Sequence, residues 1–94
     1  MDVYEKHRLD LSKIKNDCVV VLERIGYPDE YESFESVVRP SFDDAKSVRD
    51  EWFKREWDYI EKHPECFFSV NIYLKDLCSY RNERWEPDTF IPLY

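Results

Sequence analysis

The stretch that most constrains this chain is residues 41–63, which has the pattern of a long amphipathic helix. Ser41 is a favourable N-cap, and acidic residues in the first turn and basic residues in the last match the helix dipole. Pro64 then either ends this helix or begins the next one. The apolar side chains at or beside helical spacing are Ala45, Val48, Trp52, Phe53, Trp57, Tyr59 and Ile60. The rest of the chain is therefore expected to cover a face rich in aromatic groups.

A spacing of alternately three and four residues predicts another helix over residues 4–25. The residues on this seam are Tyr4, His7, Leu11, Ile14, Cys18, Val21 and Ile25. Gly26, the only glycine in the chain, falls where such a helix would end. The β-branched run over residues 18–22 is also typical of a strand, so a strand stays open as the alternative.

Two further segments have helical spacing. Residues 28–38 place Tyr31 and Phe34 on one side with two valines, and the Arg39-Pro40 pair ends the segment. Residues 65–81 fit a helix, but the alternation over residues 66–74 fits a strand equally well. A strand there needs a partner, and the best candidate is residues 18–22, because the chain has no Asn-Gly or Asp-Gly hairpin signal.

These segments predict a mostly α fold, a small bundle of about four helices. The aromatic tail, residues 85–94, contains two prolines and is expected to lie over the bundle as an extended strap. The alternative is an α+β fold with residues 66–74 as a strand. A length of 94 residues, with no low-complexity linker, predicts a single domain over residues 1–94.

The negative charge of the chain is concentrated in one region. The net charge is -7, and residues 26–44 contain six acidic residues against Arg39 alone. Because duplex DNA and anionic membranes attract basic surfaces, we expect neither as a direct partner. The expected partner is another protein with a basic surface.

The cysteine content predicts a reducing, cytoplasmic setting. Cys18, Cys66 and Cys78 are an odd number, and the first ten residues contain no long apolar run of the kind found in a secretory signal. No stretch approaches the roughly 18 apolar residues of a membrane helix.

Few residues have the pattern of a catalytic or metal site. A single glycine excludes phosphate-binding loops. His63 and Cys66 have metal-like spacing, but further ligands would have to come from apolar positions such as Cys18 and Cys78. We therefore expect no metal, no cofactor and no catalytic residue. An enzyme or small-ligand binder that uses His63 and Cys66 is the last of the alternatives.

The segment 27–42 interleaves aromatic rings with carboxylates, a composition typical of protein-binding surfaces. The predicted partner-binding residues, which extend into the next helix, are Tyr27, Asp29, Glu30, Tyr31, Glu32, Glu35, Asp43 and Asp44. In the alternative interpretation this is a short helix with aromatic side chains in the core and solvated acids.

Together these features predict a small acidic inhibitor or adaptor of a protein with a basic cleft, such as a nucleic-acid-processing enzyme. Carboxylates spaced along a helix would replace phosphates in that cleft. Bacteriocin immunity proteins and phage-encoded anti-defence proteins are analogous in composition and size. The alternative is a helical homo-oligomer with a structural or assembly role, associated through the seam of residues 4–25 or through exposed aromatic groups of the tail.

Overall fold

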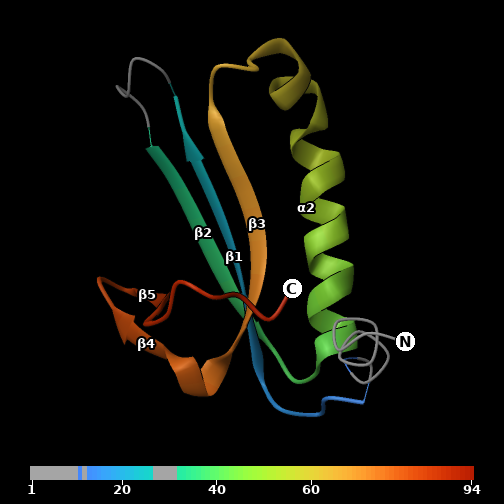
Figure 1. Cartoon of the computed structure of the whole chain (residues 1–94), viewed down its shortest axis with the longest axis vertical. Coiled ribbons are helices and arrows are strands. Elements are labelled where there is room, and N and C mark those ends of the chain that lie inside the picture. The colour runs from blue at the N-terminus through green and yellow to red at the C-terminus, as the bar shows by residue number, and fades with distance from the viewer. Residues whose placement is uncertain (1–10, 12, 27–31) are drawn as a thin grey trace.

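A three-stranded antiparallel sheet lies at the centre of the molecule, with a long helix on one face and a small hairpin on the other (Figure 1). The computed structural model describes residues 11, 13–26 and 32–94. Within these residues the elements are β1 (Cys18–Ile25), β2 (Glu32–Arg39), α2 (Phe42–Lys62), β3 (Phe67–Leu74), the 3-10 helix η1 (Lys75–Leu77), β4 (Cys78–Arg81) and β5 (Arg84–Pro87). The fold is therefore α+β, and the predicted bundle of helices is wrong.

β1 is the central strand of the sheet, in the order β2-β1-β3. Cys18 is opposite Arg39 in β2 and opposite Leu74 in β3. The first five residues of β1 are buried, so side chains on both faces of the strand are covered. A strand buried on both faces has a continuous apolar run instead of an alternating one. This explains why residues 18–25 form a strand and the predicted helix over residues 4–25 is wrong there; Tyr4 and His7 lie outside the described residues.

The main hydrophobic core lies between the sheet and α2. Its buried residues are Leu11, Cys18, Val20, Leu22, Phe42, Ala45, Trp52, Val70 and Ile72. The predicted helix over residues 41–63 is confirmed, because Ser41 is the N-cap and His63 the C-cap. The Asp44 amide donates to Ser41 Oγ at 3.3 Å. Within the described residues, α2 lacks the apolar length needed to cross a membrane.

The two other segments with helical spacing are strands. The predicted helix over residues 28–38 is wrong from Glu32 onward, where the chain forms β2. The predicted helix over residues 65–81 is also wrong, and the alternative strand over residues 66–74 corresponds to β3. Its predicted partner, residues 18–22, is confirmed in β1. Both segments form strands because β1 provides an unpaired edge on each side, and their alternate residues then lie on the α2 face.

The β4–β5 hairpin and the following tail cover part of the opposite face, which we call the outer face (Figure 1). The hairpin turns at Asn82 and Glu83, whose φ angles are 54° and 63°. Two residues with positive φ are typical of a type I′ turn, which usually contains glycine, so this hairpin was not expected. Residues 88–94 form neither helix nor strand, and Leu93 N donates to Ile72 O of β3 at 2.7 Å.

Candidate functional site

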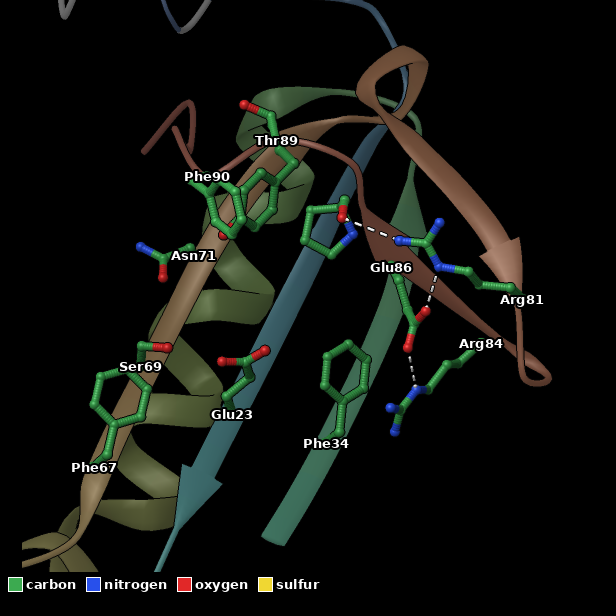
Figure 2. A pocket seen from close by; sticks show the side chains of 12 residues that line it. Glu23, Phe34, Phe67, Ser69, Asn71, Arg81, Arg84, Glu86, Thr89 and Phe90 are labelled. Atoms are coloured by element: carbon green, nitrogen blue, oxygen red, sulfur yellow. Dashed lines mark hydrogen bonds and ion pairs between the residues drawn. The ribbon is translucent and has the colours of Figure 1, made fainter.

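A cleft of about 530 Å³ lies on the outer face, between the sheet and the β4–β5 hairpin (Figure 2). We call it the outer cleft. Its lining residues are Glu23, Phe34, Phe67, Ser69, Asn71, Tyr73, Arg81, Arg84, Glu86, Pro87, Thr89 and Phe90. Ligand pockets in proteins typically have volumes of about 300 to 1,000 Å³, so this cleft is large enough to hold a ligand or a side chain of a partner.

The floor of the outer cleft is formed by alternate residues of the three strands. Glu23 of β1 is opposite Phe34 of β2 on one side and Ser69 of β3 on the other. Residues that are directly opposite each other in a sheet point to the same face. Figure 2 shows the Glu23 carboxylate on the face away from α2, with Phe34 and Ser69 on its two sides. The central strand therefore places a carboxylate in the middle of the cleft floor.

The wall formed by the hairpin contains a compensated group of charges. Glu86 accepts hydrogen bonds from Arg81 Nε at 2.6 Å and from Arg84 Nε at 3.0 Å, and Arg81 also pairs with Asp88 at 3.0 Å. The hydrogen bonds from Arg81 and Arg84 hold the pKa of Glu86 below its usual value. The Arg84 guanidinium lies 3.9 Å from the ring centre of Phe34 and so attaches the hairpin to the sheet.

Glu23 differs from the other half-buried carboxylates near it. Glu86 is paired with two arginines, and Glu56, a residue of α2 on the other side of the sheet, pairs with Arg24 of β1 at 2.9 Å. Glu23 has no hydrogen bond or ion pair to any group in the part of the chain that the structure describes. Its charge and, to a greater extent, burial raise the pKa of Tyr73 on the same face, so the Tyr73 hydroxyl stays protonated.

The lining of the outer cleft includes two exposed aromatic rings, Phe67 and Phe90, and we call these two together with their exposed neighbours Ile25 and Ile91 the apolar rim. Ile25 and Phe67 are opposite each other at the end of the β1–β3 pair. Phe67 is 55% exposed, Phe90 is 102% exposed and Ile91 is 79% exposed. Figure 2 places Phe67 and Phe90 near opposite ends of the cleft. Large apolar groups gathered around a polar cleft are typical of an interaction surface.

The predicted partner-binding residues do not line the outer cleft where they are described. Glu35 lies on the α2 face and is paired with Arg55. Asp43 and Asp44 are exposed in the first turn of α2, which packs on the other face of the sheet. Glu32 is the first residue of β2. The remaining predicted residues, which lie outside the described part of the chain, are Tyr27, Asp29, Glu30 and Tyr31.

The histidine and cysteine residues considered for catalysis or metal binding make other contacts. The Cys66 thiol lies 3.8 Å from the Tyr59 hydroxyl, and the His63 ring stacks on Tyr59 with ring centres 4.3 Å apart. Burial raises the pKa of Cys18 and, with the charges of Asp88 and Cys18, raises that of Cys78 to about 11. Both thiols are therefore protonated at neutral pH and poorly nucleophilic. Among residues 11, 13–26 and 32–94, no three His, Cys, Asp or Glu side chains form a group able to hold a metal ion.

Sequence reasoning did not identify Glu23 as a site residue because residues 4–25 were expected to form a helix. In a helix Glu23 lies on the polar side of the seam and needs no explanation. In a strand it shares a face with Val19 and Val21, both of which are buried. The signal that could have found Glu23 is the strand alternative for residues 18–22. If that strand is extended by three residues, Glu23 becomes a carboxylate on a face that is otherwise apolar.

The outer cleft is thus a polar site with one uncompensated carboxylate on its floor, a neutralised wall and an apolar rim. Comparison of this chain with known protein families, with curated proteins and with solved structures found no match. The function of the chain is therefore inferred from the geometry of the outer cleft.

Proposed function

We propose that this chain is a small protein-binding module, an inhibitor or adaptor, and that a partner with a basic surface docks on the outer cleft and its rim. The observation that carries the proposal is the Glu23 carboxylate, which is half-buried on the cleft floor without a cation among the described residues. A partly buried carboxylate has lost part of its solvation, and a nearby positive group offsets that cost. A positive group from a partner would supply this compensation.

The apolar rim supports a macromolecular partner in preference to a small solute. Phe90 and Ile91 are adjacent in the tail and are both largely in contact with water, and Phe67 is more than half exposed. Covering apolar surface releases about 25 cal/mol per Å². Aromatic groups beside a desolvated polar centre are typical of the residues that contribute most to protein–protein affinity.

The charge of the chain supports a basic partner. The net charge is -7, and the segment between β1 and β2 contributes Asp29 and Glu30. Complementary charge increases the rate of association and selects among partners. A nucleic-acid-processing protein with a basic cleft would meet this requirement, as the analogy with immunity and anti-defence proteins suggests. Three free thiols favour a reducing compartment such as the cytoplasm.

The free edge of β2 favours one alternative, a homo-oligomer. Within the described residues no strand pairs with the outer edge of β2, whereas the outer edge of β3 bonds to the tail at Ile72 and to Arg49 at Val70 O. An unpaired edge strand is a template for pairing with another chain. Sedimentation across a wide concentration range tests this alternative, and a monomer throughout would contradict it.

The proposed function is tested by quantitative capture of host proteins on three immobilised chains. One is the wild type, one carries Glu23→Gln with Phe90→Ala on the outer cleft, and one carries Glu61→Gln with Trp57→Ala on the exposed side of α2. Both variants remove one acid and one exposed aromatic ring. We expect a basic protein that the wild type and the α2 variant retain, that the cleft variant loses, and that salt releases. Equal capture by all three chains would contradict the proposal.

A further inference from the structure

We propose that the outer cleft recognises a guanidinium group, the side chain of an arginine in an extended segment of the partner. This inference rests on the proposed function and specifies its chemistry. The juxtaposition that carries it is the Glu23 carboxylate on the floor between the aromatic rings of Phe67 and Phe90 at the rim.

The cleft requires a cationic, donor-rich group because its own cations already have partners. Arg81 binds Glu86, Asp88 and Pro87 O, and Arg84 binds Glu86 and stacks on Phe34. A carboxylate or phosphate would therefore find no uncommitted cation among the described lining residues and would approach Glu23 directly. The one charge in the cleft without a described partner is negative.

Neutral groups of the cleft lining add acceptors for further N–H donors. The Asn71 amide nitrogen donates to Tyr94 O at 3.5 Å, and its Oδ1 accepts no hydrogen bond from the described residues and remains an acceptor in the cleft lining. The Ser69 hydroxyl lies directly across from Glu23. A guanidinium presents five N–H donors in a planar fork, which matches a carboxylate and neighbouring acceptors better than a single ammonium does.

The aromatic groups of the cleft favour the guanidinium further. Guanidinium groups are planar and weakly hydrated, so they stack on aromatic rings, whereas an ammonium keeps its water. This chain contains such contacts, because Arg84 stacks on Phe34 inside the cleft and Arg49 lies 4.7 Å from the Phe53 ring centre and 4.9 Å from that of Tyr94. Arg84 already lies on the Phe34 ring, and among the other aromatic rings of the lining Phe67 and Phe90 are the exposed ones, whereas Tyr73 is half-buried.

The position of the rim indicates that the guanidinium belongs to a peptide segment. Ile25 and Phe67 lie at one end of the cleft, and Phe90 and Ile91 follow one another in the tail. An arginine that enters between them would place its neighbours along the chain against these apolar groups. Free arginine would leave the same groups exposed and would bind much more weakly.

The test measures binding of the full chain to three short labelled peptides by fluorescence anisotropy. The peptides are identical except for a central residue, flanked by leucines, which is arginine, lysine or the neutral isostere citrulline. We expect the arginine peptide to bind roughly tenfold to a hundredfold more tightly than the citrulline peptide, as for a charge-assisted hydrogen bond. The lysine peptide should lie between them.

Variants separate the cleft from a general charge effect. Glu23→Gln should remove most of the preference for arginine over citrulline, and Phe90→Ala should weaken the arginine peptide several-fold. Glu61→Gln on α2, an equal change of charge, should leave the affinity unchanged. Because Phe90 is fully exposed, its removal does not disturb the core, and circular dichroism verifies the fold of each variant.

The outcomes distinguish this inference from the proposed function. Equal affinity for arginine and lysine would overturn the choice of guanidinium, while cleft-dependent capture of a basic protein would still support the function. If free arginine competes for the cleft as effectively as the peptide does, the inference that the arginine belongs to a peptide segment is overturned. Binding that is indifferent to Glu23 and Phe90 in both experiments would overturn both proposals.

Discussion

The two faces of the three-stranded sheet are covered in different ways, although they belong to the same strands. On the α2 face Leu22 is 1% exposed in a core formed with Ile72 and Trp52. On the outer face Val19 and Val21 are buried as well, but the next residue on that face, Glu23, lines an open cleft. The α2 face therefore provides stability, and the uncovered end of the outer face is available for binding.

The largest expected effect is on the free energy of unfolding, and it compares two neighbouring residues of β1 that lie on opposite faces of the sheet. Leu22→Ala should lower the free energy of unfolding by about 2 to 5 kcal/mol, because it leaves a cavity in the core. Glu23→Gln, one residue further along, should change it by no more than about 0.5 kcal/mol. Urea denaturation measures both. Similar losses for the two variants would show that the outer face also determines stability.

A smaller effect is expected at the turn of the hairpin. Glu83 has a φ of 63°, a conformation that a non-glycine residue adopts at a cost. Glu83→Gly should therefore stabilise the hairpin by about 0.5 to 1 kcal/mol. Hydrogen exchange of the β4 and β5 amides measures the gain.

Asn82→Gly is the matched control for this turn, because asparagine tolerates positive φ better than glutamate does and the gain should be smaller. If protection rises in β1 and α2 as much as in the hairpin, the two layers unfold together. The distinction between a stable α2 face and a separately opening outer layer would then fail.

The smallest effect is a local response of the outer face to acid. Arg81 and Arg84 hold the pKa of Glu86 below its usual value, so this carboxylate stabilises the fold above its unfolded pKa of about 4.3. That contribution is lost as the pH falls through the lowered pKa of the folded state. We expect NMR signals of the Trp85 indole, in β5, to broaden or shift before those of Trp52, in the core.

Glu86→Gln provides the control for the acid response, because it removes the titrating group and should remove the early change at Trp85. Simultaneous changes of Trp85 and Trp52 in the wild type would indicate that acid unfolds the whole molecule at once. The charged wall of the cleft would then have no separate role in positioning the hairpin.

Local patterns in the sequence were sufficient for one element and ambiguous for the others. The ends of α2 depend on Ser41, on the acidic first turn and on Pro64, which act through neighbouring residues and can be recognised without a fold. Residues 18–25 satisfy helical spacing and β-branched composition at once. Only pairing with two other strands decides between them, because the energy of a strand comes from its partners.

The candidate site was harder to predict than the fold. Glu35 and Glu23 are both acids in strands, and the concentration of charge in residues 26–44 favoured the former. In the structure Glu35 pairs with Arg55, whereas Glu23 lines the outer cleft. The hairpin forms one wall of the cleft and turns at Asn82 and Glu83. Because this turn does not contain the usual glycine, the hairpin and the wall that it forms were not predicted.

The sequence by itself determined the long helix and the acidic charge, and it offered residues 18–22 and 66–74 as a strand pair only as the alternative to two helices. These depend on spacing, composition and local capping. Tertiary structure alone decided which side of β1 faces α2, which carboxylates are neutralised by arginines, and which one is left on a cleft floor. The physical reason is that ion pairing and burial depend on groups far apart in the chain, and their distances follow only from the register of the sheet.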